Sequence, residues 1–236
     1  MPKRLEVEIE GLKKRLLSLS AVIEERVRWA VEAIHERDAK TAQLVMEGDN
    51  EIDESEVDLE EECLKILALH QPLAVDLRYI IAILKINNEL ERIGDLAVNI
   101  AERALVLAAL KPAKLPLDFN AMMTKTQQML QHSLDSLVHL QAETAFQVLT
   151  DDDEVDRMNR EMYTIFQKEA EKDVSHLPYL LHLLSASRHL ERIADHATNI
   201  AEDVIYLIQG EIVRHRPEQY VPHPKLEDKG ENGKSQ

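Results

Sequence analysis

The stretch Leu90–Arg103, LERIGDLAVNIAER, returns 100 residues later as Leu190–Asp203, LERIADHATNIAED. Ten of the fourteen positions are identical. Both copies place apolar residues at steps of three and four, which predicts an amphipathic helix with one buried face. A repeat this close indicates that the chain contains two copies of one structural unit.

The composition favours an all-α protein. The 236 residues include six Gly, eight Pro and only 4% aromatics, while good helix formers dominate. A formal charge of −16 disfavours binding to nucleic acid, and the single cysteine, Cys63, excludes an internal disulfide. No apolar run is long enough to span a bilayer, and residues 1–21 lack a secretory h-region. We therefore expect a cytoplasmic protein without membrane insertion.

Hydrophobic spacing predicts six helices in two groups of three. Connections are short, so each group is expected to form an antiparallel bundle. The fold prediction is two tandem antiparallel three-helix bundles related by internal duplication. The expected helices cover residues 3–36, 38–69 with an interruption at Gly48-Asp49-Asn50, 72–110, 119–149, 151–173 and 177–210. The expected domains are 1–110 and 118–210, joined by a proline-containing hinge at 111–117 and followed by a disordered tail at 211–236.

The repeated helix carries polar groups on one face. In each copy Glu, Asp, Asn and a second Glu share a face roughly opposite the buried seam. These residues are Glu91, Asp95, Asn99 and Glu102 in the first copy and Glu191, Asp195, Asn199 and Glu202 in the second. Such a face either holds a hard cation or is simply solvated, and the residues alone leave both interpretations open.

A second acidic pair precedes each copy of the repeat. Antiparallel packing is expected to bring Asp49 and Asp53 beside the first polar face, and Asp152 and Asp156 beside the second. Each group would then offer four carboxylates, which suit Mg²⁺, Ca²⁺, Mn²⁺ or iron. His196 occurs only in the second copy and is a further possible ligand there.

Common catalytic signatures are missing from the chain. Gly233-Lys234-Ser235 lacks the upstream glycine of a phosphate-binding loop, since that position is Asp228. Glu32 and His35 form only one of the two pairs that a ferritin-like di-iron site needs. We find no zinc-protease sequence and no nucleophile elbow, and therefore expect no enzymatic activity.

The doubled ERIGDxxxNIAE and ERIADHxxNIAE sequences, with HQPxAxDLR at His70–Arg78, resemble the PhoU family over residues 3 to 210. The resemblance implies a cytoplasmic negative regulator of phosphate uptake and of the phosphate-starvation response. Its implied partners are the ATPase subunit of a phosphate ABC transporter (PstB-like) and a sensor histidine kinase (PhoR-like). A homodimer is plausible because long helices are exposed.

The resemblance also implies surface metal sites formed by paired E(D)xxxD sequences. Here these are Asp49/Asp53 with Glu91/Asp95, and Asp152/Asp156 with Glu191/Asp195. The implied metal is iron, zinc, magnesium or manganese. Two alternatives stay open: a helical-bundle metal store or metallophosphatase, and a structural pair of bundles with solvated acidic faces.

Overall fold

The structure is a computed structural model that describes residues 3–112 and 119–210. Within these ranges it contains helices and no strand. The elements are α1 (Lys3–Glu36), α2 (Ala39–Glu47), α3 (Asp49–His70), α4 (Val75–Ala109), α5 (Phe119–His139), α6 (Ala142–Lys172), the short 3-10 helix η1 (Val174–His176) and α7 (Leu177–Gln209). The predicted all-α fold is confirmed.

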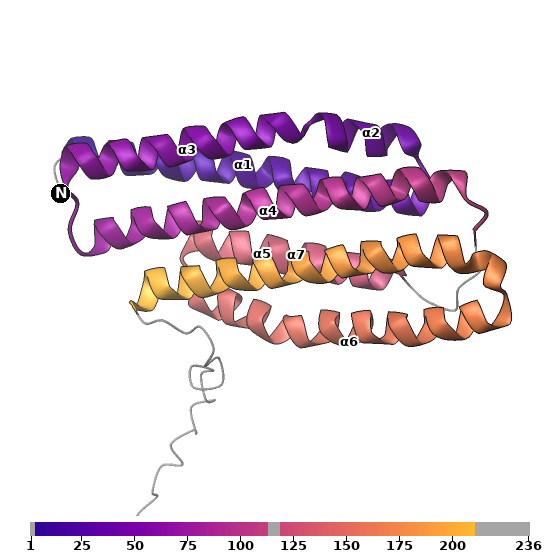
Figure 1. Ribbon diagram of the computed structural model, residues 1–236. Helices are drawn as coiled ribbons and strands as arrows, with labels where there is room; N and C mark the ends of the chain where they lie inside the picture. Colours follow the sequence, from indigo (N-terminus) through magenta and orange to yellow (C-terminus); the bar gives the residue numbers. More distant parts are fainter. Residues whose placement is uncertain (1–2, 113–118, 211–236) are drawn as a thin grey trace, which may run out of the picture.

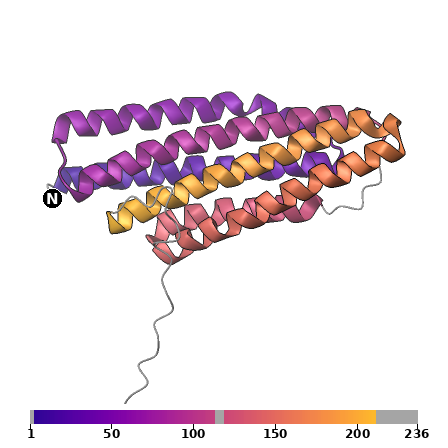
Figure 2. The same ribbon diagram turned by 60° about the horizontal axis from the view of Figure 1, so that its bottom comes forward.

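The helices form two bundles that lie side by side. In the first, α1 packs on α4 and on the broken pair α2–α3; in the second, α5, α6 and α7 pack together. The helices α4 and α7 run antiparallel along each other and form the main contact between the bundles (Figure 1). The two views place α3 and α6 at opposite outer edges of the molecule (Figures 1 and 2).

The repeated sequence occupies the two central helices. The apolar seam predicted for α4 is fully buried, at Ile86, Leu90, Ile93, Ala97, Ile100 and Ala104. Its copy on α7 is buried in the same way, from Leu190 to Ile200. Because each central helix packs against its own bundle and against its counterpart, an unusually wide face of each is apolar.

Local chemistry explains several helix ends. Asp38 caps α2, accepting a hydrogen bond from the main-chain nitrogen of Lys40 at 2.9 Å. Gly48 separates α2 from α3 as the sequence predicts. Gly210 ends α7 in the left-handed conformation with φ of 75°.

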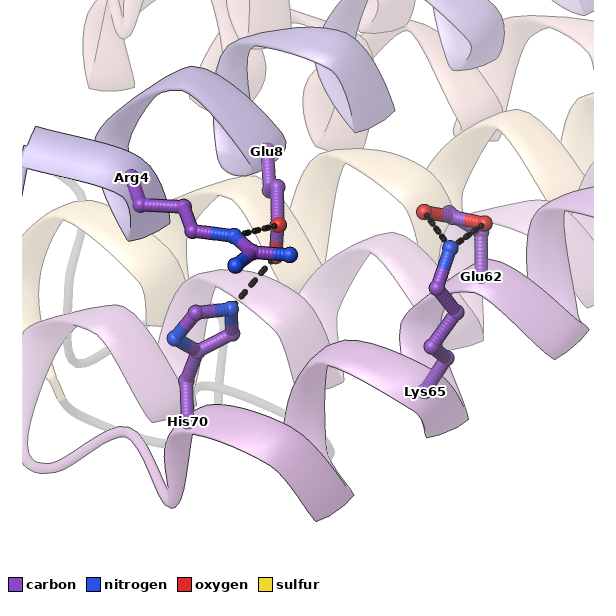
Figure 3. Close-up of polar contacts among 5 residues, drawn as sticks. All are labelled: Arg4, Glu8, Glu62, Lys65 and His70. Carbon is purple, nitrogen blue, oxygen red and sulfur yellow. Dashed lines mark hydrogen bonds and ion pairs between the residues drawn. The ribbon is translucent and has the colours of Figure 1, made fainter.

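The N-terminus of α1 is tied to the end of α3. Glu8 accepts a hydrogen bond from Arg4 Nε at 3.1 Å, and its other oxygen lies 2.6 Å from Nε2 of His70 (Figure 3). Farther along α3, Lys65 pairs with Glu62 one turn away, with an Nζ–Oε1 distance of 3.0 Å (Figure 3). The contact between Glu8 and His70 joins α1 to α3 at the end of the first bundle where α4 begins.

Three predicted boundaries are wrong. α4 begins at Val75 rather than at Pro72, because Gln71 and Ala74 adopt positive φ in the connecting loop. α5 ends at His139, before a turn in which Leu140 has φ of 49°, and α6 starts at Ala142.

The helix α6 then continues through Asp151-Asp152-Asp153, which we had expected to open a new helix. Its buried residues on either side of the acids, including Val148 and Val155, lie seven positions apart and so share one face. The burial of that face outweighs the local preference of three aspartates for a helix start.

Residues 113–117 of the predicted hinge and the predicted tail at 211–236 lie outside the described residues. Across the ranges that are described, no helix combines the length and apolar character that crossing a membrane requires.

Candidate metal centres

The packing of α3 on α4 brings together the four carboxylates predicted for the first site. Asp49 and Asp53 lie at the start of α3, and Glu91 and Asp95 lie in the middle of α4. Burial raises the pKa of Asp49, and the nearby Asp53 and Asp95 raise it further. The Oδ1 atom of Asp49 is buried and has no hydrogen-bond partner. A bound cation would satisfy this atom and offset the repulsion among the carboxylates.

Glu56 joins this cluster, although the sequence analysis did not select it. Burial raises the pKa of Glu91, with further contributions from Asp95, Glu56 and Asp53. The main-chain oxygen of Glu56 accepts a hydrogen bond from Asn87 Nδ2 at 2.9 Å, which holds this part of α3 against α4. The i,i+3 spacing of Asp53 and Glu56 was the available signal, since these positions share a helix face.

The second cluster has three Asp and one Glu at the equivalent positions of α6 and α7. Burial raises the pKa of Asp152 to about 6, helped by the charges of Asp195 and Asp156. Burial also raises the pKa of Asp195, and Glu191 and Asp156 add to this effect. The pKa of Glu191 is raised by burial and by Asp156. Asp152, Asp156, Glu191 and Asp195 therefore influence one another electrostatically, and their role as metal ligands remains a prediction.

Neither cluster is a ready-made coordination shell. Among residues 3–112 and 119–210, no three His, Cys, Asp or Glu side chains converge closely enough to hold a metal ion as they stand. The donor chemistry nevertheless fits a hard cation, because every member offers carboxylate oxygen and no thiol is nearby. Side-chain rotation on two packed helices would be needed to close either shell.

Two of the additional candidate ligands make contacts between the bundles. His196 Nδ1 lies 2.7 Å from Glu89 Oε2, and Asn199 Nδ2 donates to the same oxygen at 3.0 Å. Burial raises the pKa of Glu89, but its contacts with His196 and Asn199 lower it to a value below normal. These contacts join α4 to α7, and the sequence analysis missed Glu89 because its partners lie more than 100 residues away.

Two of the remaining candidates contact residues of their own helix. Asn99 Nδ2 donates to the main-chain oxygen of Asp95 at 2.8 Å, and Glu102 pairs with Arg103 at 2.8 Å. Glu202 is half-buried on α7. Their role as metal ligands remains a prediction.

Gly94 permits the close approach of α3 at the first cluster. A Cβ added at Gly94 would lie 3.2 Å from Ile52 Cγ2, which is tighter than ordinary packing. In the second bundle the equivalent positions hold Ala194 and Val155, and both are buried. Each pair combines a smaller residue with a larger one, so the acidic helices approach closely in both bundles.

The comparison with known proteins gives matches over nearly the whole described chain. The model of the PhoU domain matches twice, at residues 16–104 and 119–204. A phosphate-specific transport system accessory protein PhoU homolog of Aquifex aeolicus is 37% identical over 209 residues, covering 89% of this chain and 95% of that protein.

Two crystal structures are also similar. PhoU from Pseudomonas aeruginosa superposes with a TM-score of 0.83 at 37% identity, covering 87% of this chain and 99% of that one. The phosphate transport system regulatory protein PhoU from Streptococcus pneumoniae gives a TM-score of 0.79 at 29% identity, covering 89% and 99%.

Proposed function

The chain belongs to the PhoU family, and from this premise we propose that it is a negative regulator of phosphate uptake and of the phosphate-starvation response. It acts as an adaptor between the ATPase subunit of a phosphate ABC transporter and a sensor histidine kinase, in the cytoplasm and as a homodimer. The observation that carries the proposal is the double match to the PhoU domain together with relatives named for phosphate transport. The role is non-catalytic.

The proposal is tested by deleting the gene and measuring a phosphate-starvation transcriptional reporter in phosphate-rich medium. Loss of a negative regulator should raise the reporter, and a plasmid copy of the parent chain should restore repression. An unchanged reporter in the deletion strain would contradict the regulatory role.

We further propose that the two acidic clusters bind divalent or iron ions, with iron, zinc, magnesium and manganese as candidates. Asp49, Asp53, Glu91 and Asp95 hold the first ion, and Asp152, Asp156, Glu191 and Asp195 hold the second. The support is the electrostatic coupling within each cluster and the unpaired buried oxygen of Asp49. Bound metal would fix α3 to α4 and α6 to α7, and so order the surface offered to partners.

Elemental analysis and thermal unfolding test the metal sites. A cation present at 100 times its Kd should stabilise the parent by about 2.7 kcal/mol for each occupied site. The double variant Asp49→Asn/Asp95→Asn should lose the contribution of the first site, and Asp152→Asn/Asp195→Asn that of the second. Glu6→Gln/Glu143→Gln alters two exposed carboxylates outside the clusters and should keep the full metal response.

A metal store or a metallophosphatase is the second candidate, because two carboxylate clusters on a helical scaffold also suit those roles. It would be supported by hydrolysis of a phosphate monoester by the metal-loaded protein, abolished by the Asp152→Asn/Asp195→Asn variant. Purified protein without turnover and without more than two bound ions per chain would contradict it.

A further inference from the structure

The outward face of α3 carries an apolar stripe surrounded by acids. Val57 and Leu64 are 50% and 53% exposed, and Ala68 is also exposed one turn farther on. Positions separated by seven and four residues share one helix face. α3 lies at an outer edge of the molecule in both views (Figures 1 and 2), and the exposed fractions of Val57 and Leu64 show that no other described helix covers these two residues.

The acids beside the stripe are mostly unpaired. From Asp49 to Glu62 the chain has nine carboxylates and no basic residue. Among the described residues Glu54, Glu60 and Glu61 make no ion pair, while Glu51 pairs with Arg26 and Glu62 with Lys65. Because successive helix residues are rotated by about 100°, Glu54 and Glu61 lie on one side of the stripe and Glu60 lies on the other. The face therefore combines exposed apolar area with uncompensated negative charge.

A hollow beside the stripe extends this surface. It lies between α1 and α3, has a volume of about 490 Å³, and is bordered by Leu64, by the carboxylates Asp58, Glu61 and Glu62, and by Lys65, which pairs with Glu62. Arg15 on its far wall comes from α1. A long basic side chain from outside can enter it with its stem against Leu64 and its charge among the carboxylates.

The equivalent face of α6 has different chemistry. Here Arg160 and Gln167 stand where α3 has Val57 and Leu64, and Arg157 stands where α3 has Glu54. Arg157 pairs with Glu161 at 2.6 Å and Arg160 with Asp156 at 3.0 Å. The α6 face is thus neutralised by its own helix, so the exposed stripe and the unpaired acids of α3 are not a general consequence of the fold.

We propose that the outward face of α3 is a docking surface for a basic amphipathic helix of a partner protein. The apolar spacing fits a helix laid along α3, and the unpaired carboxylates select lysine or arginine beside the apolar face of that helix. The proposal does not require the metal sites, and a second copy of this acidic chain is a poor occupant because the same face would repel itself.

A synthetic peptide tests the proposal with the full-length protein. The probe is a fluorescent helical peptide of about 16 residues, with leucines on one face flanked by lysines, long enough to cover the stripe at about 1.5 Å per residue. Fluorescence anisotropy should show one site per chain, weakened as salt is raised. A scrambled peptide of the same composition should bind at least about tenfold more weakly, because it has no continuous apolar face.

Variants then locate the site. Glu54→Lys/Glu61→Lys removes the charge complementarity, and Val57→Gln/Leu64→Gln removes the apolar stripe without changing charge. Each should weaken binding about tenfold. Glu6→Lys/Glu143→Lys makes the same charge change at exposed positions elsewhere and should alter binding less than about twofold. Thermal unfolding of each variant checks that these surface changes leave the fold intact.

A graft provides the reciprocal test. Arg157→Glu/Arg160→Val/Thr164→Glu/Gln167→Leu gives α6 the counterparts of Glu54, Val57, Glu61 and Leu64 and should raise the stoichiometry from one to two peptides per chain. Equal binding by all variants, or equal weakening by the control, would overturn the proposal. Conversion of a dimer to a monomer by Val57→Gln/Leu64→Gln in light scattering would also overturn it, since the occupant would then be a second copy. Failure of this docking site would leave the reporter assay of the regulatory role unaffected.

Discussion

The first and second bundles share a scaffold but differ in how their charges are compensated. Both bury the same seam and both pair an outer acidic helix with the central helix. On α6, however, acids are paired with Lys125, Arg157 and Arg160, whereas on α3 most exposed acids have no ion-pair partner among the described residues. Duplication has therefore kept the core and the carboxylate clusters while the outer surfaces have diverged.

The contact between the bundles is asymmetric as well. Because α4 and α7 are antiparallel copies, each contact between them has an equivalent with the roles exchanged. Lys85 Nζ lies 2.8 Å from Asp203 Oδ1, but the equivalent positions hold Ser185 and Arg103, which cannot form an ion pair. The ion pair between Lys85 and Asp203 therefore has no equivalent at the other end of the contact between α4 and α7.

The largest expected effect concerns the ion pair between Lys85 and Asp203. Lys85→Met keeps the aliphatic stem but removes the ammonium beside Asp203, whose side chain is only 2% exposed. We expect the free energy of unfolding to fall by about 2 kcal/mol, since the buried carboxylate of Asp203 loses the ammonium group of Lys85. Urea unfolding measures this. The equivalent change, Ser185→Ala, should cost less than about 0.5 kcal/mol. Equal losses would show that the asymmetry has no energetic consequence.

The next effect concerns the packing pair at the first cluster. Gly94→Ala places a methyl group 3.2 Å from Cγ2 of the buried Ile52, and we expect this overpacking to outweigh the roughly 1 kcal/mol that Ala gains over Gly in a helix, leaving a net destabilisation of about 1.5 kcal/mol. Combining it with Ile52→Val recreates the residues of the second bundle, Val155 and Ala194. A double-mutant cycle in urea should therefore show favourable coupling of about 1 kcal/mol. Simple additivity of the two changes would mean that the pairs are not interchangeable.

A smaller effect is expected from the burial and charge repulsion that raise the pKa of Asp152 in the second cluster. Because the pKa of Asp152 is raised from 3.8 to about 6, its protonated form stabilises the fold below pH 4 and this stabilisation is lost as pH rises through 6. In metal-free protein, Asp152→Asn should raise stability at pH 7 by about 1 kcal/mol after allowance for solvent screening. The gain should disappear at pH 4. A gain independent of pH would assign the effect to packing instead.

The smallest effect concerns the neutralised face of α6. Arg157→Ala removes an exposed i,i+4 pair with Glu161 and should cost about 0.4 kcal/mol, mostly lost in 1 M salt. On α3, Glu54→Ala should instead be neutral or slightly stabilising, because it relieves repulsion among unpaired acids. Thermal unfolding at low and high salt compares the two. A cost at Glu54 equal to that at Arg157 would contradict the contrast in charge pairing.

Prediction from sequence succeeded where the information was periodic and local. The seam of α4 and the interruption at Gly48 each depend on a few neighbouring residues, and both predictions are confirmed. It failed at α6, where local acid chemistry indicated a helix start at Asp151. The buried face running from Val148 to Val155 outweighs that signal, and this burial exists only after packing.

For the proposed sites, repetition selected the eight candidate carboxylates, because the same spacing recurs in both copies, and their role as ligands stays a prediction. It did not identify Glu56, whose proximity to Glu91 depends on how α3 lies on α4. Nor did it identify Glu89, whose partners His196 and Asn199 come from the other bundle.

The sequence by itself determined the duplicated helical architecture and the composition of the acidic faces, since helix periodicity is a property of neighbouring residues. Only the tertiary structure decided which residues of different helices meet, such as Glu89 with His196 and Asn199. Those contacts depend on distances between helices that are remote in sequence. The ion pairs of α6 join residues one turn apart and are local, whereas the exposure of the α3 face depends on the place of α3 at the edge of the molecule (Figure 1).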